Sequence, residues 1–439
     1  MERYQEYKDS GIPWIGLIPK NWSLRRIKYI FTELKEKSDS GLESPLSLSK
    51  EKGIIPFSEK KNKTMESASY MGGKIVHKGE IVFNRFKARL FAVSGYDGIV
   101  SSDYAVYKCS QTASAEYMVK LFGTEMYREA FNRKASGIGD GFSRLYSDDL
   151  FAMYSIFPPL PEQEKIVNYL ESKTLIIDAY VAERERELRL LNELKEAEIA
   201  HVVTQGLNPD MKMKDSGIPW IGMIPEHWEV EPFGRHFTFG KGLPITKADL
   251  LSEGTAVISY GQIHAKTNTG VTMDESLVRR VSPSYLETHP QCLLQKDDFV
   301  FADTSEDLEG SGNFAFNDYE DDIFAGYHTL VAKPIDLLYP KYYAYLFQST
   351  KWKSQVRSLV NGVKVYTISK RILKNSYILI PTLKEQQEIV AYADEKCAKV
   401  NSLIAELNAE IEYLKEYKQS LIADVVTGQV NVQNERELQ

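Results

Sequence analysis

Three short segments of this 439-residue chain combine residue types that catalytic or metal sites use. Gly137-Ile-Gly-Asp-Gly141 is glycine-rich, but its spacing does not match a phosphate-binding or dinucleotide-binding loop, so a flexible loop is the simpler interpretation. His289-Pro-Gln-Cys292 is one ligand-like pair without the second pair that a zinc site needs. Glu162-Gln-Glu-Lys165 has the residue types of a metal-dependent nuclease site at the wrong spacing, and a helix N-terminus explains its acidic residues. The sequence therefore predicts no catalytic residue, no metal site and no cofactor bound by this chain.

Other segments combine positive charge with aromatic and amide groups, as nucleic-acid-binding surfaces do. Asn84-Arg-Phe-Lys-Ala-Arg89 follows a predicted strand and interleaves three cations with Phe86. Arginine can bind guanine edges with two hydrogen bonds, and each of these cations can hold a phosphate, whereas an ordinary solvated face is the alternative. The candidate DNA-contacting residues of the whole chain are Lys60, Lys61, Lys63, Asn84, Arg85, Lys87, Arg89, Arg144, Tyr260, Gln262, His264, Lys266, Arg279, Arg280 and Lys364.

The candidates in the second half differ in character from those in the first. The segment from Tyr260 to Lys266 alternates polar with small or apolar residues at an expected strand end, and one polar strand face is an equally good interpretation. Thr304 occupies the position equivalent to Phe86 and follows the acidic Asp303. Because the basic loop is not repeated there, we expect the second half to prefer different bases.

An internal repeat organises the chain. Residues 8–22 recur as residues 214–228 with twelve of fifteen positions identical, and residues 158–169 resemble residues 381–392. Each half thus consists of a short aromatic segment, a divergent globular part and a long helix. The repeat contains four tryptophans that we expect to pack between a domain and a helix, namely Trp14, Trp22, Trp220 and Trp228.

The two long helices are predicted by apolar residues spaced alternately four and three positions apart, the pattern of a coiled-coil seam. Since an isolated helix of this length would expose its apolar stripe, we expect the two helices to pair, in antiparallel orientation. Lys418 interrupts the second seam. The expected seam residues are Ile166, Leu170, Ile177, Val181, Leu188, Leu191, Val202, Val400, Ile404, Leu407, Ile411, Leu414, Leu421 and Val425.

Strand-like runs and shorter helices, expected over 116–131 and 342–359, mix in each globular part, so the fold class is α+β. The predicted organisation is a first domain over 1–160, a central helix over 161–205, a second domain over 206–380, a distal helix over 381–427 and a tail over 428–439.

Composition sets the broad class of protein. Hydrophobic residues make up 43% of the chain and charged residues 26%, values typical of a folded globular protein, and no apolar run is long enough to span a membrane. The net charge of -7 is concentrated in the predicted long helices, whereas residues 1–150 hold 24 Lys and Arg against 19 Asp and Glu. Three widely separated cysteines and a polar N-terminal segment favour a cytoplasmic protein without disulfides.

The repeated Gly-Ile-Pro-Trp-Ile-Gly segments and the Pro-Pro-Leu-Pro-Glu-Gln-Glu helix start resemble those of the specificity subunits of type I restriction-modification systems. The resemblance covers essentially the whole chain; the second copy departs from it with Pro381-Thr-Leu-Lys-Glu-Gln-Gln. It implies two target-recognition domains separated by two long helices, each domain reading one half of a bipartite site in double-stranded DNA.

The same resemblance implies partners and cofactors. Two methyltransferase subunits that modify adenine N6 and ATP-dependent restriction subunits would dock on this non-catalytic chain, and S-adenosylmethionine, ATP and Mg would be bound by those partners. The alternative is a coiled-coil adaptor that binds proteins and has no sequence-specific affinity for DNA.

Overall fold

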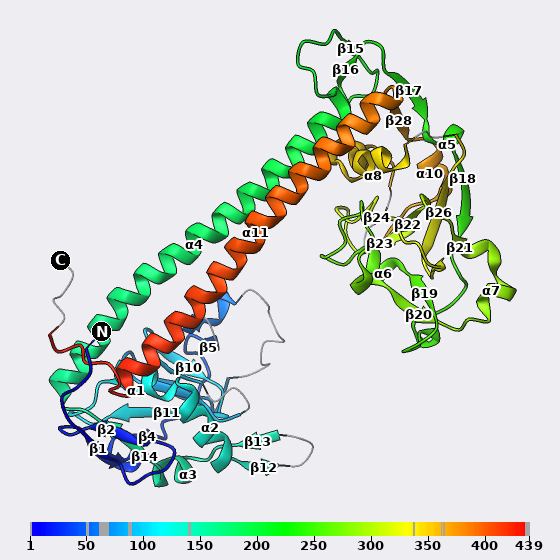
Figure 1. Ribbon diagram of the computed structural model, residues 1–439. Coiled ribbons are helices and arrows are strands. Elements are labelled where there is room, and N and C mark those ends of the chain that lie inside the picture. The colour runs from blue at the N-terminus through cyan, green and yellow to red at the C-terminus, as the bar shows by residue number, and fades with distance from the viewer. Residues whose placement is uncertain are drawn as a thin grey trace. The chain divides into compact units, whose positions relative to one another are not determined.

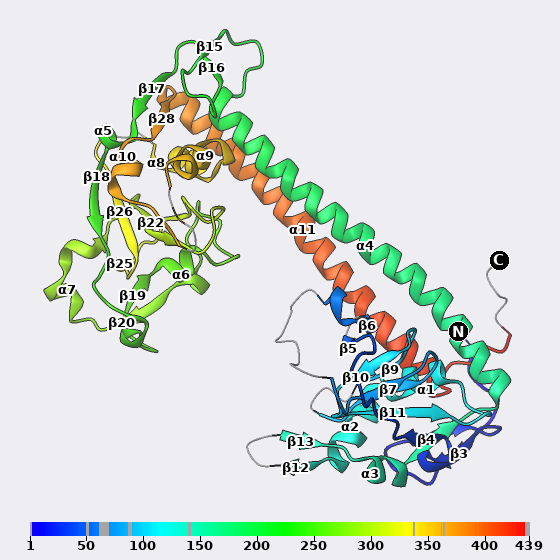
Figure 2. The same ribbon diagram turned by 180° about the vertical axis from the view of Figure 1, so that it is seen from behind.

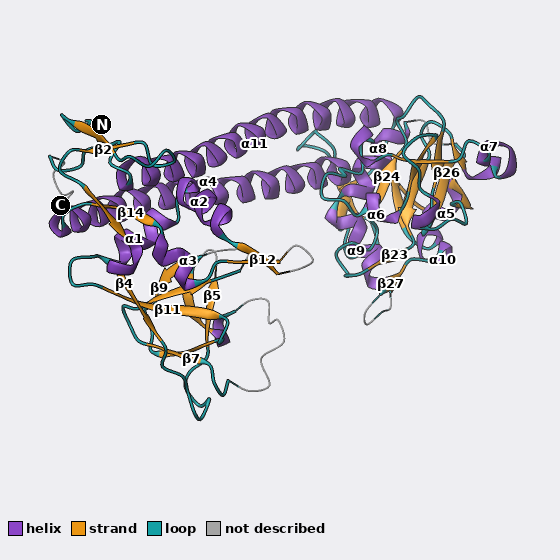
Figure 3. Cartoon of the chain, turned by 90° about the horizontal axis from the view of Figure 1, so that it is seen from below, coloured by secondary structure: helices purple, strands orange, loops and turns teal. Residues whose placement is uncertain are grey.

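The computed structural model describes residues 2–49, 52–60, 70–86, 90–138, 142–336, 339–360, 362 and 365–434 (Figure 1). The chain forms two compact units, of which one comprises Met1–Glu185 with Asn408–Gln439 and the other Arg186–Leu407. Both units mix helices and strands, which confirms the predicted α+β class (Figure 3). No helix within the described residues is long and apolar enough to cross a membrane.

Two long helices, α4 (Leu160–Gln205) and α11 (Leu383–Val426), run side by side and contribute to both units (Figures 1 and 2). In the first unit Lys418 of α11 binds Asp178 of α4, with Nζ 2.6 Å from Oδ1, and Arg184 lies 3.3 Å from a carboxylate oxygen of Glu410. The partner number falls as the residue number rises, so the pair is antiparallel, as expected. Lys418, the polar interruption of the predicted seam, is therefore used for an ion pair between the helices.

The same register continues in the second unit. Lys396 lies 2.9 Å from Glu198, and Lys195 donates to Asn401 over 3.1 Å. All fourteen predicted seam residues are buried or partly buried, whereas the residues on the outer faces of both helices are mostly exposed. The apolar periodicity thus identified the contact face of both helices.

The first unit contains a four-stranded antiparallel sheet of order β4-β11-β8-β9 and several two-stranded pairs. Its elements are β1 (Tyr7–Asp9), β2 (Leu17–Pro19), β3 (Ser23–Arg26), β4 (Phe31–Leu34), β5 (Leu46–Ser49), β6 (Gly53–Pro56), β7 (Lys74–Val76), β8 (Ile81–Asn84), β9 (Phe91–Val93), β10 (Gly98–Val100), β11 (Tyr104–Cys109), α1 (Ala115–Phe122), α2 (Glu125–Lys134), β12 (Ser136–Ile138), β13 (Phe142–Arg144), α3 (Ser147–Ala152) and β14 (Tyr154–Phe157).

The second unit repeats this sheet as β18-β26-β22-β24 and adds a second four-stranded sheet of order β20-β19-β25-β21. Its elements are β15 (Met213–Asp215), β16 (Met223–Pro225), β17 (Glu229–Pro232), α5 (Phe233–His236), β18 (Phe237–Lys241), β19 (Thr255–Ile258), α6 (Tyr260–Ile263), β20 (Arg279–Val281), α7 (Tyr285–Thr288), β21 (Leu293–Leu294), β22 (Phe299–Ala302), β23 (Thr304–Ser305), β24 (Phe314–Phe316), β25 (Ile323–Ala325), β26 (Thr329–Pro334), α8 (Pro340–Gln348), α9 (Thr350–Leu359), β27 (Tyr366–Thr367), α10 (Lys370–Lys374) and β28 (Tyr377–Ile380).

Two of the expected helices are each divided in the structure. The expected helix over 116–131 is α1 followed by α2, because Gly123 ends α1 and Thr124 adopts an extended conformation. The expected helix over 342–359 is α8 followed by α9, because the Ser349 side chain accepts from the backbone N–H of Trp352 and starts a new helix. Apolar periodicity alone did not detect these breaks, since both parts of each pair face the same core.

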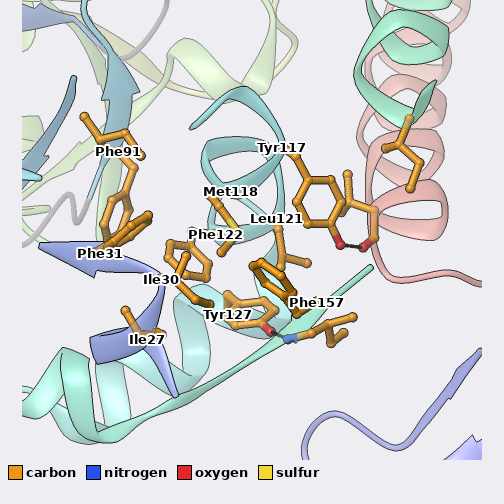
Figure 4. Packing of buried hydrophobic residues seen from close by; sticks show 14 of the residues in the cluster. Ile27, Ile30, Phe31, Phe91, Tyr117, Met118, Leu121, Phe122, Tyr127 and Phe157 are labelled. Atoms are coloured by element: carbon orange, nitrogen blue, oxygen red, sulfur yellow. Dashed lines mark hydrogen bonds between the residues drawn. The ribbon is translucent and has the colours of Figure 1, made fainter. Parts of the chain in front are cut away.

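The core of the first unit joins aromatic residues of the sheet and helices to the ends of the two long helices (Figure 4). Phe122 of α1 contacts Phe31 and Phe131 edge to face, with ring centroids 5.7 and 5.4 Å apart. Leu421 and Val425 of α11 belong to this same core, together with the start of α4. The first globular domain is therefore completed by residues from the far end of the sequence.

A buried tyrosine fastens each domain to the last turn of a long helix. Tyr117 donates its hydroxyl hydrogen to the backbone carbonyl of Val426 at the end of α11 over 2.8 Å (Figure 4). Tyr342 likewise donates to the carbonyl of Val203 at the end of α4 over 2.8 Å. The last four carbonyls of a helix lack intrahelical partners, so each phenol satisfies one that is otherwise unpaired. Burial raises the pKa of both tyrosines well above the ordinary value, so both phenols stay protonated donors.

The repeated Glu-Gln at the start of each long helix has a structural role. Glu162 accepts from Tyr4 and Asn21, and its counterpart Glu385 accepts from Trp228 Nε1 over 3.1 Å. The following glutamines donate to the proline carbonyls that precede each helix. Partial burial would raise the pKa of Glu385, but hydrogen bonds from Thr382, Trp228 and His227 lower it below the ordinary value. These contacts explain the second repeated motif without any catalytic role.

The tryptophans of the repeat divide into two groups. Trp22 and Trp228 are completely buried, which confirms the prediction that they pack between a domain and a helix end. Trp14 is partly buried against Tyr127, whereas Trp220 is 41% exposed.

The two tyrosine contacts predict matched losses of stability. Tyr117→Phe and Tyr342→Phe each leave a buried helix-end carbonyl unsatisfied, and each should lower the free energy of unfolding by about 1–2 kcal/mol. Urea unfolding measures the loss, and hydrogen exchange shows which unit is destabilised. Tyr29→Phe, at an exposed ring, is the control and should change nothing. Equal stability of all three variants would contradict this role of the buried phenols.

Candidate nucleic-acid interface

In the first domain the predicted basic loop begins where β8 ends. The Asn84 side chain accepts from the backbone N–H of Phe86 and so shapes the turn. Arg85 points back into the domain, where its guanidinium pairs with Glu33 and donates to Ser147 over 3.1 Å. Partial burial opposes ionisation of Glu33, but Ser147, Arg85 and Lys74 together lower its pKa. The described part of this loop is thus held by internal contacts.

Arg144 lies on the same cluster although it is 58 residues further along the chain. Its guanidinium carbon is 4.9 Å from the centre of the Phe86 ring and 5.6 Å from that of Tyr146, and its NH2 group lies 3.3 Å from Asp103 Oδ1. The structure therefore brings Arg144 together with the Asn84–Phe86 turn, a proximity that the sequence did not indicate. A partly exposed guanidinium fixed on aromatic rings is suited to bind phosphate.

The remaining first-domain candidates are placed as follows. Lys60 packs over the Phe57 ring, with Nζ 5.5 Å from the ring centre. Four other candidates of the first domain lie outside the described residues, namely Lys61, Lys63, Lys87 and Arg89. Lys364 of the second domain also lies outside them.

In the second domain the expected strand end at Tyr260 is instead a single helical turn, α6. Ser259 and Gln262 form a reciprocal cap, in which the Gln262 amide oxygen accepts from the Ser259 N–H, and this cap turns the chain out of β19. The expectation of an alternating strand face was therefore wrong. Gln262 is used for this cap, whereas Lys266 is exposed.

The arginine pair lies on β20. The Arg279 guanidinium donates to the carbonyls of Ser276 and Val278, over 2.9 and 3.0 Å, and so stabilises its own turn. Arg280 is partly buried in the middle of the strand.

A pocket of about 750 Å³ opens beside α6 in the second domain. Tyr260, Gly261 and His264 line it at α6, and the other lining residues come from the chain after β22 and from two more distant segments. They are Thr304, Ser305, Glu306, Asp307, Glu309, Gly310, Asn313, His328 and Val365. Three carboxylates in this wall contrast with the arginines of the first domain.

Sequence reasoning identified only Tyr260 and His264 in this pocket. The acidic run after β22 was visible as the non-basic counterpart of the Asn84–Arg89 loop, which was the available signal. His328 and Asn313 gave no local signal, because only the fold brings them to α6. Among the described residues no group of three or more His, Cys, Asp or Glu side chains is arranged to hold a metal ion.

Comparison with known proteins identifies a domain in the second half of the chain and proteins similar to most of its length. The model of the type I restriction modification DNA specificity domain matches residues 225–413. The type I restriction enzyme MjaVIII specificity subunit of Methanocaldococcus jannaschii is 23% identical over 353 residues, covering 77% of this chain and 76% of that protein. The EcoBI specificity subunit of Escherichia coli is 22% identical over 298 residues, covering 66% and 60% respectively.

Solved structures agree on the fold. A chain from a structure describing complex assembly and conformational transition of a type I restriction-modification system superposes with a TM-score of 0.69 at 17% identity, covering 94% of this chain and 99% of that one. The HsdS subunit from Thermoanaerobacter tengcongensis superposes with a TM-score of 0.50 at 16% identity, covering 94% and 98%. The type I restriction modification DNA specificity domain over residues 225–413, together with similarity along most of the chain to type I specificity subunits, supports DNA recognition as the role of this chain.

Proposed function

We propose that the chain reads a bipartite site in double-stranded DNA, with one domain for each half-site. The observation that carries this proposal is a common framework with different surfaces. Both domains use the same four-stranded sheet order and the same tyrosine contact to a helix end. At the equivalent end of that sheet, however, the first domain presents Arg144 on Phe86, and the second presents the carboxylate-lined pocket. Two different surfaces on one framework are suited to two different half-sites.

The long helices would act as the spacer between the two domains that read the half-sites. Both α4 and α11 are continuous and have one antiparallel register, so their length is a fixed quantity of the chain. At 1.5 Å per residue, a helix segment of seven residues spans about 10.5 Å, the rise of roughly three base pairs. The gap of unread base pairs would then be set by helix length rather than by contacts to DNA.

Two methyltransferase subunits would dock on the helices. Beside the seam, each helix carries a second stripe, a row of residues with the same alternating spacing of four and three. Each position of the stripe on α4 has its counterpart on α11 223 residues later, the offset of the repeat. On α4 the stripe is Ile176, Tyr180, Glu183, Glu187, Leu190 and Leu194, and on α11 it is Lys399, Leu403, Glu406, Glu410, Tyr413 and Tyr417.

The apolar members of both stripes are exposed, including Tyr180 and Tyr413 in the first unit and Leu190 and Leu194 in the second. Exposed large apolar side chains in a regular row are typical of a protein interface. A surface that is present once in each repeat fits two copies of one partner. ATP-dependent restriction subunits would join the same complex, and S-adenosylmethionine, ATP and Mg would be bound by these partners.

The spacer role predicts a change in the methylated motif. A seven-residue insertion after Glu187 in α4, combined with one after Leu407 in α11, preserves the seam and should lengthen the unread gap by about three base pairs. Sequencing of adenine methylation, with the methyltransferase partner present, measures both half-sites and the gap. An insertion in α4 alone is the control and should destabilise the pair. An unchanged gap in the doubly inserted chain would contradict the spacer role, and no bipartite motif with the unmodified chain would contradict the proposed function.

The Arg144 cluster predicts a contribution to phosphate binding. Arg144→Ala should weaken binding of the complex to specific and non-specific DNA alike, by about tenfold at low salt, and should reduce the salt slope of log Kd by about one. The methylated motif should stay the same. Arg133→Ala, at an exposed arginine of α2 paired with Glu129, is the control. A relaxed base in the first half-site would instead assign Arg144 to base reading.

The repeated stripes predict stepwise loss of the methyltransferase. Leu194→Glu or Tyr417→Glu should leave folding intact, because both side chains are exposed, and each should remove one of two bound subunits. The double variant should remove both, as measured by native mass spectrometry. Glu193→Lys and Glu416→Lys, at matched exposed positions away from the stripe, are the controls. Full assembly of the double variant would show that the stripes are not the docking surface.

A further inference from the structure

Lys353 on α9 places an ammonium group inside the second domain without a carboxylate partner. The side chain is 8% exposed, and Nζ donates to Asn313 Oδ1 over 3.2 Å and to Gln348 Oε1 over 3.0 Å. No described carboxylate lies within ion-pair distance of Nζ. Burial, with the nearby Arg357, lowers the pKa of Lys353 to about 8, while the more distant Glu196 acts in the opposite direction. Since a buried charge costs free energy, its position calls for an explanation.

A chain of hydrogen bonds leads from this ammonium group to the pocket wall. Asn313 Nδ2 lies 3.2 Å from His264 Nδ1, and His264 Nε2 lies 2.8 Å from the carbonyl oxygen of Thr304. Asn313, His264 and Thr304 all line the pocket, whereas Lys353 lies behind it. A continuous chain of hydrogen bonds therefore connects the pocket wall to the buried ammonium group of Lys353.

The chemistry of the donors fixes the direction of every bond in this path. An ammonium group only donates, so the Asn313 atom that faces it must be the amide oxygen. The amide nitrogen then faces His264 and donates, so Nδ1 of that ring must accept. The Thr304 carbonyl only accepts, so Nε2 carries the hydrogen. His264 is thereby held in the tautomer that carries its hydrogen on Nε2.

The opposite tautomer would break this pattern. A hydrogen on Nδ1 would face the Asn313 amide nitrogen, and turning the amide over would point its N–H groups at the Lys353 ammonium. The ring of Tyr260 packs against those of His264 and His328, with centroids 6.2 and 5.4 Å apart, in the pocket wall that also holds three carboxylates. Lys353 is thus the group that fixes the orientation of the Asn313 amide.

We propose that Lys353 is the positioning residue that holds the Asn313 amide in one orientation and His264 in its Nε2–H tautomer, and so sets the hydrogen-bonding pattern with which the second domain reads its half-site. This inference rests on the proposed function of the pocket as a reader of DNA. Both ring nitrogens of His264 are engaged, one by Asn313 and one by the Thr304 carbonyl, so the ring is fixed in the pocket wall. Loss of Lys353 would release the amide and the ring and change the preferred bases.

The test replaces the ammonium group by an apolar side chain of similar length, in the full complex with methyltransferase. With Lys353→Met, a plasmid library randomised at the second half-site should show about tenfold weaker preference for the original bases, the size of one mismatched base pair, while the first half-site is unchanged. Histidine side-chain NMR of the full chain should show the Nε2–H tautomer of His264 in the unmodified chain and a mixture of tautomers in the variant.

Asn313→Asp provides a second route to the same state if Lys353→Met fails to fold. The new carboxylate binds Lys353 but has no N–H to donate to His264 Nδ1, so the Nε2–H tautomer should lose its support and the second half-site should change although the lysine is present. Lys351→Met, at a partly buried lysine of the same helix that donates to Thr204, is the control and should keep the original second half-site. Unchanged half-site and tautomer in both test variants would overturn this inference alone. The absence of any second half-site in the unmodified complex would overturn the proposed function on which it rests.

Discussion

A helix of 46 residues with an apolar stripe along one side needs a partner in water, and the pairing of α4 with α11 is the constraint on which the rest of the structure depends. Each globular domain packs on the start of one long helix and the end of the other. The end of each helix leaves carbonyls without intrahelical partners, and Tyr117 and Tyr342 satisfy one in each case. Packing and hydrogen bonding thus hold each domain to two helices at once.

This arrangement separates the residues that join a domain to the helices from the residues that differ between the two domains. Trp22, Trp228 and the Glu-Gln pairs at the helix starts are repeated because they form the contacts between a domain and the helix ends. The turns after β8 and β22 differ in charge between the two domains, with Arg85 after β8 and Asp303 after β22. A framework of this kind permits the recognition surface to change without a change in the helix pair.

The parts of the structure that follow from local periodicity were predictable from the sequence. The repeat and the alternating four-and-three spacing predicted the two long helices and the buried face of each. The breaks at Gly123 and Ser349 were missed, because the apolar pattern continues across them. Tyr260 was assigned to a strand, since a one-turn helix capped by Ser259 and Gln262 has too few residues to show a helical period.

The candidate recognition surfaces were predictable only in part, because they are assembled from distant segments. Arg144 reaches Phe86, and His264 meets Asn313 and Thr304, through contacts that span 40 to 58 residues. Lys353 was not among the candidate residues, since a buried lysine and an exposed one have the same appearance in a sequence. Its role depends on the donors and acceptors around it, which only the fold brings together.

The core of the first domain contains Leu421, Val425 and Val432 as well as residues that precede α4. All of Arg186–Leu407 is therefore synthesised before the residues that complete the core of the first domain. The second domain has all of its core residues available earlier, although its sequence begins later. Consequently the domain that is synthesised first is the last to finish folding, and during synthesis it presents an apolar surface for as long as the second half of the chain takes to emerge.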